Sequence, residues 1–417
     1  MQSKKDINYT IFTKTIVTLF LLSVFSYVFY FSLTNIINYW TFTEIHINYS
    51  LGFSKRGLLG SLMLYLESIG VPKNIFFSSI FYLITLCNIF LFLNLLNRFV
   101  KNHLLFYIFF ALNPALLLFS FYDLGGYARG ESFGISVCLL HVLFAQKLYS
   151  QKINYQRYLK ISLLFIFPLS LLTMLIHDLN ILFLSFHFFT ALLIVYQNQF
   201  KNIKEFQYLL ISNCILTIFI IYLLFSHPFT KEFAKELYDI LPEKDGTSFW
   251  IWNSIASSFS VRIDSEIQSM QNPNAITLYF FIFLFYFFPI FFLLRKTTES
   301  SKFQLSLTSV SIIPFLILFF IGRDWGRWIH IILIVLFACF IQFKEKEMIV
   351  PKNYRYKILT YLFIAFFLFQ FSFTRIPHCC NLVRLNLNLF GGIMPKIEVF
   401  YKILNNKYDI KKRFQTY

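Results

Sequence analysis

Residues 75–96, IFFSSIFYLITLCNIFLFLNLL, contain no charged side chain and decide the fold of this chain. At about 1.5 Å per residue, a helix of this length crosses a hydrocarbon core of roughly 30 Å. A bilayer offers no water to pair with backbone N–H and C=O groups, so such a segment is expected to be a helix. Comparable apolar runs lie near 15–36, 103–121, 132–148, 159–176, 179–196, 207–226, 276–294, 304–321, 327–343 and 357–373. The sequence therefore predicts an all-α, polytopic integral membrane protein with about eleven transmembrane helices.

The composition excludes a water-soluble globular protein. Only 14% of the 417 residues are charged, whereas a soluble domain carries about 25%. The formal net charge of +17 does not indicate a nucleic-acid partner, because Lys and Arg accumulate in the cytoplasmic loops of membrane proteins. Membrane lipid is therefore the expected surrounding of most of the chain.

The basic residues predict an orientation. With a cytoplasmic N-terminus, the cytoplasmic loops hold 19 of the 37 Lys and Arg residues, the opposite loops hold 10 and the tail holds 8. This asymmetry follows the positive-inside rule. The first apolar run follows Lys4 and Lys5 and has no small-residue cleavage site, so we expect a retained helix rather than a signal peptide.

A single transmembrane domain, 1–417, is expected, because the chain has no internal repeat and no low-complexity linker. Its first outer loop, 36–74, contains GLLGSLMLYLESIG, which is too short and too charged to span and fits an interfacial helix. A long outer loop covers 227–275, and a C-terminal tail covers 374–417. The unusual polar residues all lie in the outer loops.

The turn GRDWGRW joins two predicted spans and combines a carboxylate with cations and aromatic rings. Arg323 and Arg327 flank Asp324, and guanidinium groups recognise phosphate oxygens in a bidentate manner. Trp325 and Trp328 offer faces on which a sugar can stack. The alternative is that the carboxylate pairs with one Arg and both indoles belong to the interfacial aromatic belt.

Two further turns carry cations. Lys55 and Arg56 lie among glycines just before the expected interfacial helix, where backbone N–H groups and the helix dipole favour an anion such as phosphate. Binding of lipid headgroups by a structural helix is the alternative. Arg129 lies in YDLGGYARGE together with Asp123 and Glu131, and there the alternative is a structural turn with an internal ion pair.

Two acid–imidazole pairs are candidates for proton transfer. His177 and Asp178 form a very short helical hairpin, in which the alternative role of Asp178 is to cap the following helix. Glu44 and His46 follow the first span. Adjacency in sequence does not place either base within reach of a substrate proton, so both pairs depend on the fold.

The remaining ligand-type residues predict no metal or cofactor. His141, His187 and His330 lie within spans and are expected to be satisfied core histidines. The chain has no HExxH, paired CxxC or DxD motif, and the adjacent Cys379 and Cys380 give no disulfide framework. It also lacks a P-loop and a GxGxxG motif, so nucleotide binding is not indicated.

The stretches GFSKRGLLG (52–60) and DWGRW (324–328), with a YDLG turn between them, resemble a group of bacterial envelope membrane proteins. These are polytopic GT-C-type glycosyltransferases and polysaccharide polymerases. The resemblance implies a polyprenyl-phosphate-linked saccharide as donor, used at the outer face of the bacterial inner membrane. It also places a catalytic carboxylate in the first outer loop, where this chain has Glu44 rather than the more usual Asp. The YDLGGYARGE turn departs from the group's pattern, because its Arg lies further along.

The resulting hypothesis gives each candidate residue a role. Asp324, Glu44 and Asp178 compete as the catalytic base. Phosphate binding is assigned to Lys55, Arg56, Arg129, Arg323 and Arg327. Stacking on the sugar is assigned to Trp325, Trp328 and Tyr122. No protein partner is indicated.

Three other functions remain open at the level of sequence. A transporter or flippase of a lipid-linked saccharide is favoured less, because the chain shows no internal repeat. A non-catalytic assembly subunit is the second, and it would tolerate alanine at the outer carboxylates. An acyltransferase is the third, since His and Asp also serve acyl transfer.

Overall fold

The computed structural model describes residues 4–34, 39–54, 56–100, 104–119, 129–197, 203–226, 229–240, 251–253, 255–256, 273–297, 309, 311–321, 324–341 and 365. Throughout these ranges the regular structure is helical. The first half of the chain contributes α1 (Lys4–Thr34), α2 (Tyr39–Glu44), α3 (Gly57–Ser68), α4 (Lys73–Phe99), α5 (Leu104–Ala111), α7 (Glu131–Tyr149), α8 (Tyr155–Ile161), η2 (Ser162–Ile166), α9 (Phe167–Ile176), η3 (Asp178–Leu182) and α10 (Phe183–Gln197). The second half contributes α11 (Ile203–Ser226), α12 (Lys231–Asp239), α15 (Pro273–Thr297), α17 (Leu318–Ile321) and α18 (Trp325–Ile341).

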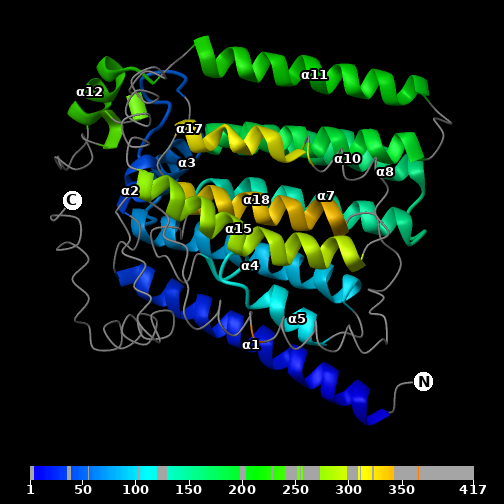
Figure 1. Ribbon diagram of the computed structural model, residues 1–417. Coiled ribbons are helices and arrows are strands. Elements are labelled where there is room, and N and C mark those ends of the chain that lie inside the picture. Colours follow the sequence, from blue (N-terminus) through cyan, green and yellow to red (C-terminus); the bar gives the residue numbers. More distant parts are fainter. Residues whose placement is uncertain are drawn as a thin grey trace.

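The long helices lie side by side as a bundle, with short helices gathered at one end (Figure 1). The end that carries α2, α3 and α12 is called the α3 end below, and it lies opposite the end at which the chain begins. Along α4 the colours run from the α3 end toward α5, and α7 also begins at the α3 end. The last residues of α4 and α7 therefore lie at the same end of the bundle as the start of α1.

Four helical segments in the described part of the chain are long and apolar enough to cross a membrane: Thr10–Tyr30, Lys73–Phe99, Glu131–Tyr149 and Tyr155–Ile176. Shorter apolar helices cover Asp178–Leu192, Leu210–Phe219, Tyr279–Phe291 and Trp325–Ile341. This confirms the all-helical class and indicates a membrane protein. The predicted span at 357–373 lies outside the described residues apart from residue 365.

One predicted span is not a continuous helix. α5 ends at Ala111, and residues 112–118 form turns. Pro114 has no N–H group and disfavours helical geometry at the residue before it, so the helix cannot continue through Asn113. The side chain of Asn113 accepts a hydrogen bond from the backbone N–H of Ala115 at 2.9 Å and so stabilises the turn. The prediction of one helix over 103–121 was wrong.

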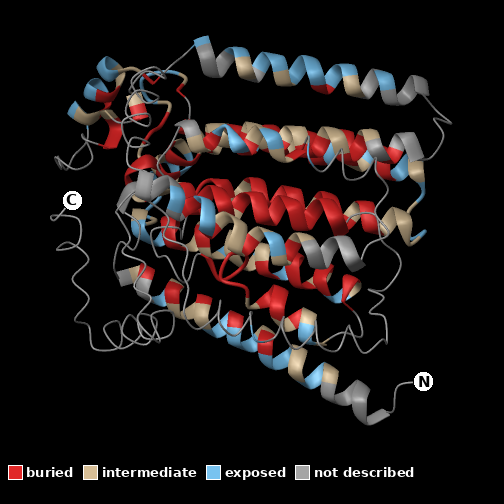
Figure 2. Ribbon diagram, in the orientation of Figure 1, coloured by how far each residue is buried: buried red, intermediate tan, exposed pale blue. Residues whose placement is uncertain are grey.

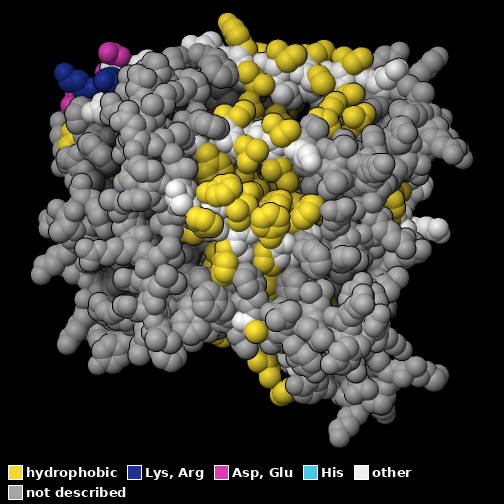
Figure 3. All heavy atoms as spheres, viewed as in Figure 1, with side chains coloured by type: hydrophobic (Ala, Val, Ile, Leu, Met, Phe, Trp, Pro, Cys, Tyr) yellow, Lys and Arg dark blue, Asp and Glu magenta, His cyan; other side chains and the backbone are white. Residues whose placement is uncertain are grey.

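The centre of the bundle is α18, which packs against α15 and α7 and is buried along almost its whole length (Figure 2). In contrast, α1 and α11 expose large apolar side chains, including Phe12, Leu19, Ile218 and Phe219. Figure 3 shows hydrophobic side chains over the described part of one side of the bundle, and charged side chains at the upper left, where α12 lies. Apolar side chains on the outside are what a helix facing lipid requires.

The segment predicted to be an interfacial helix is helical and forms α3. It packs against α4 and α9 and buries Leu59 and Met63, whereas Tyr65 and Glu67 are exposed. Gly60 permits close packing, because a side chain there would overlap the carbonyl oxygen of Ile47. The loop after the first long helix is thereby fixed against α3, and this loop carries Glu44.

Candidate functional site

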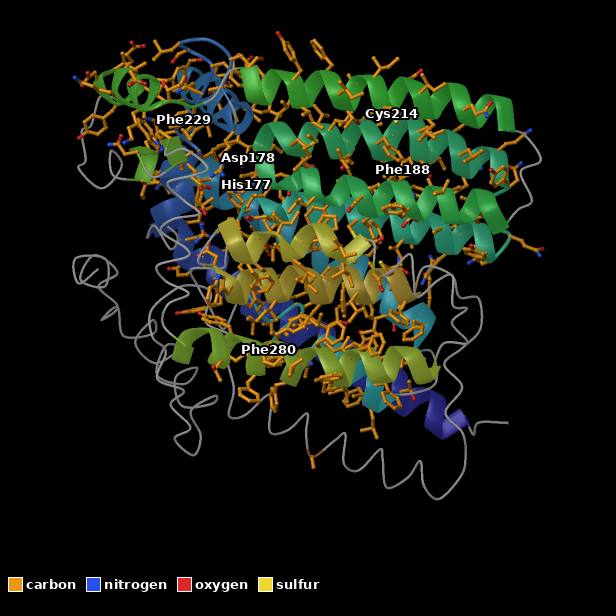
Figure 4. All side chains as sticks on the ribbon, turned by 45° about the horizontal axis from the view of Figure 1, so that its top comes forward. His177, Asp178, Phe188, Cys214, Phe229 and Phe280 are labelled. Atoms are coloured by element: carbon orange, nitrogen blue, oxygen red, sulfur yellow. The ribbon has the colours of Figure 1, made fainter. Side chains whose placement is uncertain are left out.

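Charged side chains from five separate parts of the chain converge at the α3 end of the bundle. Figure 4 labels two of the residues, His177 and Asp178, which lie at this end on the connection between α9 and η3. The other participants come from α2, from the residue before α3, from the start of α7 and from the start of α18. The structure therefore brings the predicted residues Glu44, Arg56, His177, Asp178, Asp324 and Arg327 into one site.

Arg56 joins two carboxylates. Its Nη1 atom lies 2.7 Å from Oε1 of Glu44, and its Nη2 and Nε atoms lie 2.7 Å and 2.8 Å from Oδ1 of Asp178. Burial alone would lower the pKa of the guanidinium, but Asp178 and Glu44 outweigh burial and raise the pKa above its ordinary value. The backbone of Arg56 has φ of 66°, a left-handed conformation that non-glycine residues rarely adopt. Such strain persists where the surrounding structure compensates for it, here through the two ion pairs.

Arg327 joins a second pair of carboxylates. Its Nη2 atom lies 2.6 Å from Oδ2 of Asp324 and 3.5 Å from Oε1 of Glu131. The guanidinium lies over the ring of Trp328, 4.4 Å from the ring centroid. Asp324 directly precedes α18, and its main-chain carbonyl accepts a hydrogen bond from Trp328 at 3.1 Å. The first turn of α18 thus fixes an acid, a cation and an aromatic face together.

His177 lies between these two ion-pair groups. Its Nε2 atom is 3.7 Å from Oε1 of Glu131 and 4.0 Å from Oε2 of Glu44. Its Nδ1 atom accepts the backbone N–H of Leu179 at 3.4 Å, so the neutral ring carries its proton on Nε2, facing the two carboxylates. Burial lowers the pKa of His177, although Glu131 opposes the shift. The neutral imidazole is therefore the resting form at neutral pH.

Backbone packing fixes the position of this imidazole. A side chain at Gly130 would place its Cβ atom 2.7 Å from the Cβ atom of His177, so only glycine permits this approach. Asn180 donates hydrogen bonds to the carbonyl oxygens of Gly130 at 3.1 Å and Thr173 at 2.9 Å. The start of α7 is thereby held against the turn between α9 and η3.

Glu131 is the innermost carboxylate of the site. It is 3% exposed, and neither of its carboxylate oxygens accepts a hydrogen bond from another residue in the described part of the chain. Asp178 and Asp324 lie nearer the surface, with side-chain exposures of 24% and 22%. The site therefore has a solvent-facing edge at these two aspartates and a buried carboxylate behind them.

Arg129 is the third buried guanidinium. Burial lowers its pKa, and the neighbouring Arg327 adds to this, whereas Asp324 and Glu44 oppose the shift. Its electrostatic neighbours thus include members of both ion-pair groups, which places it between them. The described part of the site contains the carboxylates of Glu44, Glu131, Asp178 and Asp324 and the guanidinium groups of Arg56, Arg129 and Arg327.

Two sequence interpretations were wrong in detail. His46 does not pair with Glu44: its Nδ1 atom lies 2.7 Å from the carbonyl oxygen of Phe42, and burial lowers its pKa to about 4. The side chain that caps η3 belongs to His177, whereas Asp178 binds Arg56. A side chain can turn toward a distant partner as easily as toward its neighbour, so adjacency did not decide either pairing.

The other predicted residues divide into two groups. Trp325 points into the core, where its Nε1 atom donates to the carbonyl oxygen of Phe319 at 3.1 Å and its ring meets Tyr279 edge-on. Lys55, Tyr122 and Arg323 lie outside the described residues, as do most of 227–275 and all of 374–417.

Two residues of the site were not assigned a role by the sequence. Glu131 was visible only as part of a turn with an internal ion pair, yet its carboxylate lies beside Arg327 and His177 from other segments. Trp252, from the long loop after α12, is fully buried and donates from Nε1 to the carbonyl oxygen of Thr43 at 3.0 Å. A Trp in a polar outer segment gives no sequence signal for such a contact.

The fold and the site together define a helical membrane protein with a buried acid–arginine–histidine cluster at one end of its bundle. Comparisons with protein-family models, with curated proteins and with solved structures find no match. Function therefore rests on the chemistry of the cluster.

Proposed function

We propose that this chain is a membrane glycosyltransferase or polysaccharide polymerase that uses a polyprenyl-phosphate-linked saccharide. The observation that carries this proposal is the buried Glu131 carboxylate, which lies 3.7 Å from His177 and 3.5 Å from Arg327 at one end of an apolar bundle. A base next to cations is what glycosyl transfer requires, and apolar helix surfaces suit a polyprenyl tail.

The proposed reaction divides the work between these groups. The anomeric carbon–oxygen bond to the phosphate breaks, and a new bond forms between that carbon and the acceptor oxygen. Glu131 takes the proton of the acceptor hydroxyl, and Arg129 and Arg327 stabilise the phosphate that leaves. Stacking of a sugar on Trp328, and contributions from Lys55, Arg323 and Tyr122, remain predictions.

The choice of Glu131 follows from the ion pairs of the other candidates. Glu44 and Asp178 each lie 2.7 Å from Arg56, and Asp324 lies 2.6 Å from Arg327. These short contacts hold each of the three carboxylates against a guanidinium, whereas neither oxygen of Glu131 accepts a hydrogen bond from another described residue. The two aspartates at the solvent-facing edge are better suited to hydrogen-bonding a polar substrate. Glu44, Asp178 and Asp324 nevertheless stay candidates for the base, and the transfer assay below tests Glu131 against them.

The proposed location is the bacterial inner membrane, with about eleven spans, a cytoplasmic N-terminus and the α3 end on the outer side. Two observations support this orientation. The site lies at the end of the bundle opposite the N-terminus (Figures 1 and 4). Arg98 and Lys147, near the ends of α4 and α7, lie toward the N-terminal end.

The first experiment measures binding of undecaprenyl phosphate to the full chain in lipid nanodiscs by native mass spectrometry. We expect the wild type to retain the lipid and Arg327→Ala to lose most of it. Arg157→Ala removes an exposed arginine near the start of α8 and serves as the matched control. Equal retention by all three proteins would refute a phosphate-binding role for the cluster.

A second experiment tests transfer itself. Lipid-linked saccharides extracted from a bacterial envelope serve as donor, and release of polyprenyl phosphate is followed by mass spectrometry. We expect release with the wild type, release with the control Glu67→Gln, and loss with Glu131→Gln. Full activity of Glu131→Gln would exclude Glu131 as the base and favour Asp178 or Asp324.

A transporter or flippase of a lipid-linked saccharide is the second candidate, because buried ionisable groups beside apolar membrane helices commonly mark a substrate path. Transport predicts that the lipid-linked saccharide changes leaflet and is recovered intact. Transfer predicts that the sugar–phosphate bond is cut. A non-catalytic assembly subunit predicts neither result.

A further inference from the structure

The outward side of α3 carries a stripe of apolar side chains. Leu62, Tyr65 and Ile69 are exposed, and their spacing of three and four residues places them on one side of a helix. Ile69 directly follows α3, and its N–H group donates to the carbonyl oxygen of Leu66 at 3.2 Å, so the helical turn continues to this residue. Another side of α3 buries Met63 against the bundle. The helix is therefore apolar both where it packs against the bundle and where it faces outward.

This stripe leads along the chain into the exposed apolar surface of a long helix. α4 begins at Lys73, shortly after α3 ends, and exposes Ile75 in its first turn and Leu83 further along. An ion pair between Glu67 and Lys73, with an N–O distance of 3.2 Å, joins the end of α3 to the start of α4. Because α4 is long and apolar enough to cross a membrane, its outward apolar side chains suit contact with lipid. The outward side of α3 therefore adjoins a surface that suits lipid.

Exposed tyrosines mark the same end of the bundle on two other helices. Tyr30 is 67% exposed and lies about one turn before the end of α1, and Tyr222 is 64% exposed and lies about one turn before the end of α11. Both helices end at the α3 end (Figure 1). Tyrosine gathers where a membrane meets water, because its ring is apolar and its hydroxyl group can bond to water. Together with Tyr65, which is 63% exposed, these rings form the pattern of an interfacial aromatic belt.

The helix α12 lies at the same end of the bundle and has the opposite character. Its exposed side chains include the charged residues Lys231, Glu232, Lys235 and Glu236, whereas its apolar residues Ala234 and Leu237 are buried. In Figure 1, α12 lies further from the middle of the bundle than α3 does. Charged side chains favour water and apolar side chains avoid it. The two helices therefore indicate a boundary between lipid and water that passes between them.

We propose that α3 lies in the interfacial layer of the membrane and presents its outward stripe to phospholipid. The interface at this end passes through the level of Tyr30, Tyr65 and Tyr222, and α12 lies in the water beyond it. An interfacial helix inserts its apolar side at the boundary between headgroups and acyl chains. The partner of the stripe is the phospholipid of that leaflet, rather than a second copy of the chain or another protein.

The depth of α3 in the membrane sets the depth of the charged site. Arg56 directly precedes the first residue of α3 and lies 2.7 Å from Glu44 and 2.7 Å from Asp178. These ion pairs therefore lie at the level of the lipid headgroups, where water and polar groups reduce the cost of a charge. A phosphate attached to a lipid lies at the same level. This depth suits the proposed function without depending on it.

The test is photocross-linking of the full chain in the membrane of the cells that produce it. The photoreactive amino acid p-benzoylphenylalanine is introduced through an amber codon at one exposed position at a time: Leu62, Tyr65 or Ile69 on the stripe, Leu83 on α4, or Lys235 on α12. Leu83 is the control for lipid and Lys235 is the control for water. Mass spectrometry of the purified protein then identifies the attached molecule. We expect phospholipid adducts at the stripe positions and at Leu83, and no lipid adduct at Lys235.

Fragmentation of the adducts measures the level of the interface. We expect the photoreactive group at Tyr30, Tyr65 or Tyr222 to attach near the glycerol end of the acyl chains. At Leu83, which lies further along α4, we expect attachment deeper in the chains. Attachment at Tyr65 as deep as at Leu83 would overturn the proposed level.

Two other results would overturn the contact with lipid. The first is a covalent link from Leu62, Tyr65 or Ile69 to a second copy of the chain or to another protein, which would show that protein covers the stripe. The second is a lack of lipid adducts at these positions while Leu83 forms them. A lipid adduct at Lys235 as abundant as that at Tyr65 would contradict the place of α12 in water. None of these results bears on glycosyl transfer, because the measurement needs neither donor nor acceptor saccharide.

Discussion

The guanidinium of Arg56 lies 2.7 Å from Glu44 and 2.7 Å from Asp178, a residue 122 positions further along the chain. It therefore attaches the first loop after α1 to the turn between α9 and η3. Removing one charged member of such a buried group leaves the other charges uncompensated. This lowers the free energy of unfolding by more than the intact group adds to it. Arg56 is thus a structural element of the site. The effect of replacing Arg56 on stability can be measured separately from the effect of replacing Glu131 on transfer.

Replacement of Arg56 should destabilise the protein. We expect Arg56→Ala to lower stability by about 3 kcal/mol, because Glu44 and Asp178 would then be adjacent uncompensated carboxylates. The measurement is the unfolding temperature in detergent at neutral pH, with Arg157→Ala as an exposed control. An unchanged unfolding temperature would show that the ion pairs contribute little.

Glu131→Gln should separate chemistry from folding. The substitution keeps the shape of the side chain, and the amide oxygen of glutamine can still face Arg327 and His177 as an acceptor. We expect loss of saccharide transfer by at least about a hundredfold, the usual contribution of a general base, with retained binding of undecaprenyl phosphate. A loss of binding to the same degree would mean that Glu131 organises the site rather than acting as base.

Gly130→Ala should displace His177 without touching its chemistry. The added methyl group would lie 2.7 Å from two atoms of the His177 side chain, and tight backbone packing leaves that ring little room to move. Transfer activity should fall by about tenfold or more, since a shift of the order of 1 Å is enough to impair catalysis. Ser132→Ala, two residues further along in the first turn of α7, is the control. Wild-type rates for Gly130→Ala would show that the position of His177 is unimportant.

Trp252→Phe should loosen the loop that carries Glu44. Phenylalanine preserves most of the packing against Ile47 and Leu237 but loses the 3.0 Å hydrogen bond to the Thr43 carbonyl oxygen. The expected cost is about 1 kcal/mol. Hydrogen exchange should increase for residues 43–48 and stay unchanged along α18, which is buried in the centre of the bundle. Equal protection in both proteins would contradict this role of Trp252.

The stability of the protein should fall in mild acid, because burial disfavours the protonated form of His46. Burial lowers the pKa of His46 to about 4, from about 6.5 in an unfolded chain, so the folded state binds fewer protons. The contribution of neutral His46 to the free energy of unfolding is complete above about pH 6.5 and is lost as the pH falls toward 4. His46→Asn keeps a donor for the Phe42 carbonyl oxygen and removes the titration. Its unfolding temperature should depend less on pH over this range, and an identical pH profile would contradict the assignment.

The sequence by itself determined the helical class and the end of the bundle at which the charged cluster lies. Long apolar runs without charges can satisfy their backbone groups only as helices in a bilayer, so the spans over 73–99 and 131–149 follow from local pattern. Glu44, Asp178 and Asp324 lie between the apolar runs and therefore at helix ends. Every second connection between antiparallel helices lies at the same end of the bundle.

Tertiary structure alone decided which charged groups meet. Arg56 was read from sequence as a phosphate ligand, yet its closest partners are Glu44 and Asp178; Glu131 was read as part of a local turn, yet it faces His177 and Arg327. The pairing of His141 with His187 likewise needed α7 and α10 to be adjacent. An apolar pattern is fixed within one segment by its exclusion from water. An ion pair or a hydrogen bond depends on distances of a few ångströms between segments, which only the packing of the helices sets.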